Sequence, residues 1–176
     1  LVHRDARGAT DGVALRLPPQ TGLDLNVHYV NRTDAELPGE AYVNLHAAEP
    51  GTVRHLARPI NLGTTDIVLP PQRRTTITRE FAVSDSTWSI VALTSHTHAR
   101  GERFVIRVRG GVHDGRVLYE STDWEHPVMK SFAPVVVLRR GDRLVAEITY
   151  HNATDRTIRF GLTSEDEMGI VFGYYY

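Results

Sequence analysis

Apolar and polar residues alternate along most of the chain with a period of two. Because successive side chains of a β-strand point to opposite faces, this period predicts strands that are buried on one side. Glycine, proline and aspartate residues separate the alternating runs, as turns require. The pattern predicts strands over residues 13–17, 23–30, 41–48, 88–93, 104–109, 135–138, 144–150 and 170–176.

Many short strands with turns between them are typical of an all-β protein. The expected fold is an antiparallel β-sandwich of the jelly-roll kind. The run over residues 41–48 ends in the turn residues Pro50 and Gly51, so a domain boundary is expected there. The sequence is therefore divided into residues 1–49 and residues 50–176.

Composition excludes several classes of function. Twenty basic and 21 acidic residues give a net charge of −1, which argues against a nucleic-acid-binding surface. The chain has no cysteine, which excludes disulfides, cysteine zinc sites and thiol nucleophiles. No apolar run is long enough for a membrane-spanning helix. Lys130 is the one lysine among many arginines, which favours a GC-rich, bacterial source, and the start at Leu1 suggests part of a longer gene product.

Two histidines in the segment His96-Thr97-His98 could share a metal ion. They end a predicted strand and are two residues apart, so both side chains project from one face. Imidazole nitrogen is a common ligand for transition metals. The alternative is a pair of surface or core histidines that happen to alternate.

Met168 is a second candidate ligand. It follows three acidic residues and precedes the last predicted strand. A thioether is a soft ligand that favours copper(I), and imidazole also suits copper. The open alternative is that Met168 fills a gap in the core.

These residues, in this order, resemble the copper type II, ascorbate-dependent monooxygenases, which include peptidylglycine α-hydroxylating monooxygenase and dopamine β-monooxygenase. The resemblance covers residues 50–176, the family's second, catalytic copper domain, and residues 1–49 resemble the end of its first copper domain. Besides the histidines and Met168, it rests on Tyr119 and on residues 132–134, 141–142, 149–150, 161–167 and 174–176.

The resemblance implies that His96, His98 and Met168 bind one copper ion, with no catalytic residue beyond these ligands. It implies hydroxylation of an aliphatic C–H bond of a small organic substrate by O2, with electrons from ascorbate or a redox protein. It also implies a place outside the cytoplasm, either periplasmic or secreted.

His28 resembles a ligand of the family's other, electron-donating copper, because it lies in a Val-His-Tyr sequence. That site also needs an adjacent His-His pair, which this chain lacks. Either the pair lies upstream of Leu1, or the second copper has been lost. Alternatively, His28 is a strand histidine at a domain edge.

Three further positions depart from the family pattern. The animal peptidylglycine enzyme holds its substrate's carboxylate with Arg, Asn and Tyr side chains, and here the positions read Thr94, Ile170 and Phe172. The resemblance therefore implies an apolar or uncharged substrate, although Arg100 and Arg103 could still supply charge. Animal members also have a disulfide that would join the positions of Gly169 and Ile148.

Two other functions stay open on the sequence alone. The first is a non-catalytic copper-binding module for storage, sensing or assembly, which the missing His-His pair keeps possible. The second is a metal-free binding sandwich, which would require His96, His98 and Met168 to lie apart.

Overall fold

The structure is a computed structural model that describes residues 2–4, 10–25, 27, 29, 31–49, 51–84 and 86–176. The chain forms two compact units, Leu1–Leu56 and Ala57–Tyr176. The boundary expected between residues 49 and 50 falls a few residues before this division. That the first unit is the end of another copper domain stays a prediction.

The first unit contains one antiparallel strand pair, β1 (Val2–Arg4) and β2 (Thr10–Leu15). None of the described residues between 16 and 54 lies in a strand, so the strands predicted over residues 23–30 and 41–48 are wrong there. Alternation shows which face of a strand would be buried, but a strand also needs a hydrogen-bonded neighbour. The large apolar residues that the structure describes in these two runs, such as Leu23 and Tyr42, are instead exposed. His28 lies outside the described residues.

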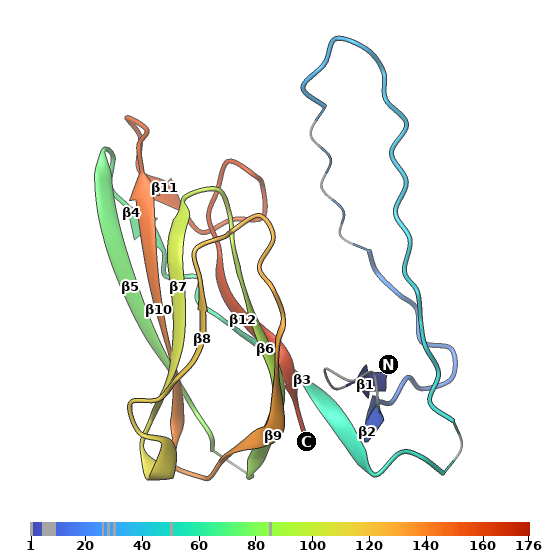
Figure 1. Cartoon of the computed structure of the whole chain (residues 1–176). Coiled ribbons are helices and arrows are strands. Elements are labelled where there is room, and N and C mark those ends of the chain that lie inside the picture. Colours follow the sequence, from blue (N-terminus) through green and yellow to red (C-terminus); the bar gives the residue numbers. More distant parts are fainter. Residues whose placement is uncertain are drawn as a thin grey trace. The chain divides into compact units, whose positions relative to one another are not determined.

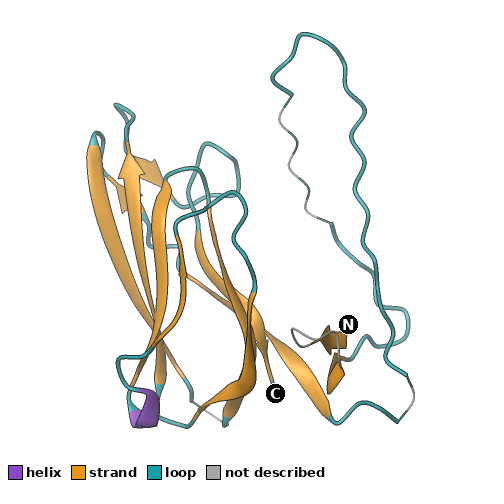
Figure 2. Ribbon diagram, viewed as in Figure 1, coloured by secondary structure: helices purple, strands orange, loops and turns teal. Residues whose placement is uncertain are grey.

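The second unit is a sandwich of two four-stranded antiparallel layers (Figures 1 and 2). One layer has the order β3-β12-β6-β9 and the other the order β5-β10-β7-β8. The first layer consists of β3 (His55–Gly63), β12 (Gly169–Tyr175), β6 (Trp88–Thr97) and β9 (Lys130–Leu138). The second consists of β5 (Arg73–Ala82), β10 (Arg143–Asn152), β7 (Gly101–Arg109) and β8 (Val117–Ser121).

Two smaller elements complete this unit. Strands β4 (Val68–Leu69) and β11 (Ile158–Arg159) form a short antiparallel pair. The turn η1 (Gly111–His113) is 3₁₀-helical. No helix among the described residues is long and apolar enough to cross a membrane. The prediction of an all-β, antiparallel sandwich is confirmed, and its jelly-roll winding stays a prediction.

The core lies between the two layers and contains Leu93, Ile106, Leu144 and Tyr150, all fully buried. Burial of each such side chain stabilises the fold by roughly 1.5–3 kcal/mol. Along the second half of β6, Leu93, Ser95 and Thr97 are buried, whereas Thr94 and His96 are only half-buried. The alternation in the sequence thus places His96 on the face of β6 that points away from the core.

Candidate metal centre

His96 and His98 lie close together at the end of β6. Their ring centroids are 5.3 Å apart, and the rings are inclined at 82°. Two imidazoles that share one ion through metal–nitrogen bonds of about 2.0 Å, at a roughly tetrahedral angle, would have centroids about 5 Å apart. His98 is 8% exposed and His96 is half-buried. The spacing of the two rings therefore fits a shared metal ion.

Met168 reaches the same end of β6 from the neighbouring strand. Gly169 pairs with Thr97 and Ile170 with His96, so Met168 and His98 each lie one residue beyond the last pair of the two strands. One carboxylate oxygen, Oε1 of Glu167, accepts hydrogen bonds from the backbone N–H groups of both His98 and Met168. Two such bonds hold the two nitrogens within roughly 6 Å of each other. Met168 is half-buried and is not part of the hydrophobic core, which argues against a role as core filler.

The ring of His98 is oriented by a backbone carbonyl. Its Nδ1 atom lies 3.1 Å from the carbonyl oxygen of Asp166. A carbonyl oxygen can only accept, so Nδ1 is the donor, and Nε2 is the nitrogen that can bind a metal when the ring is neutral. Such a hydrogen bond on the far nitrogen is typical of metal-binding histidines, because it fixes both tautomer and ring orientation.

Glu167 is buried at the centre of this arrangement, with an exposed fraction of 0%. Its Oε1 accepts the two N–H groups named above, and its Oε2 accepts the N–H of Arg100 at 3.1 Å. Burial raises the pKa of Glu167, and the three N–H donors partly offset that effect. The sequence shows Glu167 only as the last of three acidic residues, and no pattern in it separates this carboxylate from its exposed neighbours.

The turn that carries Met168 is also held from the opposite layer. The hydroxyl of Tyr150 donates to the carbonyl oxygen of Met168 at 2.9 Å. Burial raises the pKa of Tyr150, so the hydroxyl stays protonated. A Cβ atom on Gly169 would lie 2.5 Å from that hydroxyl and 2.6 Å from Cδ1 of Ile148. Positions 169 and 148, which correspond to a disulfide in animal members of the resembled family, are therefore in direct contact here.

Thr94, Ile170 and Phe172 lie together beside His96, on the face that points away from the core. Ile170 pairs with His96 and Phe172 pairs with Thr94 across the two strands. The ring centroids of Phe172 and His96 are 6.2 Å apart. The hydroxyl of Thr94 donates to the carbonyl oxygen of Pro127 at 3.4 Å. This bond holds the loop between β8 and β9 against this face. The surface next to the histidines is thus largely apolar.

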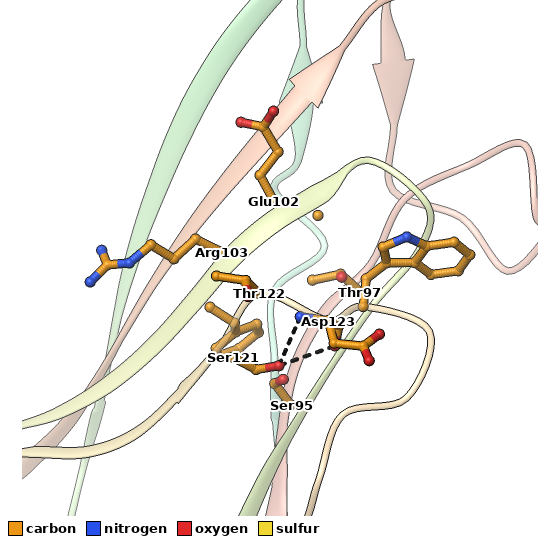
Figure 3. A pocket seen from close by; sticks show the side chains of 10 residues that line it. Ser95, Thr97, Glu102, Arg103, Ser121, Thr122 and Asp123 are labelled. Carbon is orange, nitrogen blue, oxygen red and sulfur yellow. Dashed lines mark hydrogen bonds between the residues drawn. The ribbon is translucent and has the colours of Figure 1, made fainter.

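A small pocket lies on the other side of β6. Its lining includes Ser95, Thr97, Glu102, Arg103 and Thr122, as Figure 3 shows. Ser121, at the end of β8, and Asp123 also line the pocket and hydrogen-bond to each other. Ser95 and Thr97 point to the opposite face of the strand from His96, so this pocket is separate from the histidine pair.

The candidate donor set is two imidazoles, from His96 and His98, and the thioether of Met168. Among the described residues, no three His, Cys, Asp or Glu side chains group together as a metal site. A thioether is a further possible ligand, and together with imidazole it suits copper(I) better than harder divalent ions. The residues present therefore fit copper.

Comparison with known families gives a match over the second unit. Residues 57–176 match the family described as "Copper type II ascorbate-dependent monooxygenase, C-terminal domain". No curated protein sequence matches the chain. The match covers His96, His98 and Met168. The chain therefore belongs to the copper type II ascorbate-dependent monooxygenases, and residues 57–176 are the family's C-terminal domain.

Proposed function

We propose that this chain hydroxylates an aliphatic C–H bond of a small, uncharged organic substrate, using copper, O2 and a reductant. The family is a copper monooxygenase family that uses ascorbate. The observation that carries the proposal is the 5.3 Å separation of the His96 and His98 rings, with Met168 bridged to His98 through Glu167.

Three side chains would hold the copper ion. His98 would bind through Nε2, because Nδ1 faces the carbonyl oxygen of Asp166. His96 would bind beside it, and the thioether of Met168 would favour the reduced ion. Copper bound there supplies one-electron redox chemistry and activation of O2. Two imidazoles and one thioether leave coordination positions open for a small molecule.

The neighbouring surface would bind and shield the substrate. Ile170 and Phe172 present apolar groups beside His96, where they would exclude water from the reacting C–H bond. The two cations that the sequence leaves as possible sources of charge have other partners. Arg100 contacts the carbonyl oxygen of Asp166 at 3.4 Å, and Arg103 pairs with Glu120 at 2.8 Å. An apolar or uncharged substrate therefore suits this surface better than a carboxylate.

Membership of the family also supports a proposal for the electron donor and for the location of the protein. Ascorbate, or a redox protein in its place, would supply electrons, and the chain would work outside the cytoplasm. We propose one copper site in this chain, and a second only with upstream sequence that supplies partners for His28.

Copper(I) binding tests the site directly. The protein should bind one copper(I) per chain in competition with a chromophoric chelator, and X-ray absorption should show both nitrogen and sulfur ligands. His96→Ala should lose this binding, whereas His113→Ala, in η1, should keep it. Equal binding by the protein and His96→Ala would overturn the proposed site.

Oxygen uptake distinguishes the proposed monooxygenase from a non-catalytic copper-binding module. With copper and ascorbate, the loaded protein should consume O2 faster than its His96→Ala variant. Tight copper binding without that difference would favour a copper-binding module for storage, sensing or assembly. Absence of copper binding would favour a metal-free binding sandwich.

A further inference from the structure

We infer that Glu167 is a positioning residue that holds the His-X-His segment and the methionine turn in one place. The inference rests on the proposed copper site. Glu167 touches no reacting atom, and it acts on the backbone of two ligands. This role is distinct from binding the metal, which we assign to its neighbours.

The carboxylate joins two segments that are far apart in the chain. It accepts hydrogen bonds from the backbone N–H groups of three residues. His98 lies 69 residues before Glu167, Arg100 lies 67 residues before it, and Met168 follows it directly. Both oxygens are used, and Oε1 is shared between the two ligand residues. One side chain thus fixes the distance between the two backbone segments that must present nitrogen and sulfur to the same ion.

The N–H groups of His98 and Arg100 lie where regular strand pairing stops. Strand β6 ends at Thr97, and the chain turns back at residues 98–100, where Gly101 donates to the carbonyl oxygen of His98 at 3.0 Å. A buried N–H without an acceptor is costly, and the two oxygens of a carboxylate can accept several such groups. Glu167 therefore replaces the strand partner that residues 98–100 no longer have.

Glu167 is itself firmly held. Its backbone N–H donates to the carbonyl oxygen of Arg159 at 3.0 Å, and its carbonyl oxygen accepts from Gly161 at 3.2 Å. Both bonds run to the chain that leads out of β11, which belongs to the small strand pair. The carboxylate is thus attached to the body of the unit, not only to the turn it stabilises.

A positioned ligand set binds its metal more tightly than a loose one. Displacements of about 0.5 Å weaken designed and natural sites, and removal of supporting groups typically costs 10–100-fold in metal affinity. Loss of the Glu167 carboxylate should separate the His-X-His segment from the methionine turn. Met168 lies in a turn, whereas His96 lies within β6, so the thioether should be the ligand that is lost first.

The test compares Glu167→Ala and Glu167→Gln with the matched control Asn152→Ala. Asn152 also has an exposed fraction of 0%, and its side chain also joins separate backbone segments. Its amide donates to the carbonyl oxygens of Leu69, Pro70 and Arg156. Both alanine variants should lower the melting temperature. Only Glu167→Ala should also lower copper(I) affinity, by roughly 10–100-fold, and weaken the sulfur signal in X-ray absorption. Glu167→Gln keeps one carbonyl oxygen and should give an intermediate loss.

The outcomes separate this inference from the proposed function. If the unchanged protein binds no copper, both are overturned. If it binds copper and the Glu167 variants bind it equally well with the same sulfur signal, only the role of Glu167 is overturned. If Glu167→Ala does not fold, the Glu167→Gln variant is the test. If Glu167→Gln has the same copper(I) affinity and the same sulfur signal as the unchanged protein, the inference is rejected. Equal losses of affinity in Asn152→Ala and the Glu167 variants would show a general effect of stability, and would also reject it.

Discussion

His98 Nδ1 lies 3.1 Å from the carbonyl oxygen of Asp166, so the residue two positions before Met168 determines which nitrogen of His98 faces outward. The hydrogen bond thus couples the orientation of one proposed ligand to the turn that carries another. If the turn shifts, the ring must turn with it. We therefore expect a displacement of this turn to disturb both the nitrogen ligand and the sulfur ligand.

The orientation of His98 predicts different results for two amide substitutions. A Gln side chain places a polar atom near the position of Nε2, whereas an Asn side chain places one near Nδ1. His98→Gln should therefore keep more copper(I) than His98→Asn, as measured by competition with a chromophoric chelator. The reverse order would show that His98 uses Nδ1.

Met168→Ala should weaken binding of copper(I) more than binding of copper(II). Loss of the soft thioether should cost roughly tenfold or more in copper(I) affinity, or about 1.4 kcal/mol. Because Met168 is half-buried, the urea midpoint should change little. Met129→Ala is the matched control, since Met129 is the chain's other methionine and is 45% exposed. Equal effects of the two substitutions would count against Met168 as a ligand.

Gly169→Ala should destabilise the second unit. A Cβ atom there would lie 2.5 Å from the Tyr150 hydroxyl and 2.6 Å from Ile148 Cδ1, so neighbouring atoms must shift. Overpacking of this kind costs about 1–3 kcal/mol, measurable by urea unfolding. Ile148→Ala should recover part of that loss in the double variant, because it removes one of the two contacts. Purely additive losses would show that Ile148 does not limit this position.

Glu80 should make stability depend on pH in the acid range. Its hydrogen bond with Arg143, and the charges of Arg109 and Arg143, lower its pKa from the ordinary value of 4.5. A group whose pKa is lower in the folded state stabilises the protein above its unfolded pKa, and this contribution is lost as the pH falls through the folded pKa. In Glu80→Gln, melting temperature should therefore fall less steeply below about pH 4.5.

Salt provides the control for that experiment. Glu80 lies at the protein surface, and screening weakens interactions between exposed charges. The difference in slope between Glu80→Gln and the unchanged protein should shrink in molar salt. A difference that persists would point to a change in buried structure instead.

Part of the fold and of the site is visible in the sequence because it depends on local pattern. The alternation through β6 predicts His96 and His98 on one face, and their ring centroids lie 5.3 Å apart. That Met168, just before β12, shares a metal ion with them stays a prediction. The same pattern misleads at residues 23–30, because alternation cannot show whether a neighbouring strand is present. The pattern does not predict β5, because Ile77 is the one buried residue along this strand.

Glu167 could not be found in this way. Its importance comes from N–H groups contributed 67 and 69 residues earlier, and nothing in the local sequence marks them as unpaired. The contact between Gly169 and Ile148 is similar, because it joins two opposing layers of the sandwich. Such relationships require the fold itself.

The contact between Gly169 and Ile148 also bears on the surroundings in which the protein can work. The turn is held by packing against Ile148 and by a hydrogen bond from the Tyr150 hydroxyl, and neither can be cleaved by a thiol. The chain contains no cysteine. Dithiothreitol or glutathione should therefore leave this turn intact. The architecture beside the metal would be equally secure in an oxidising and in a reducing medium.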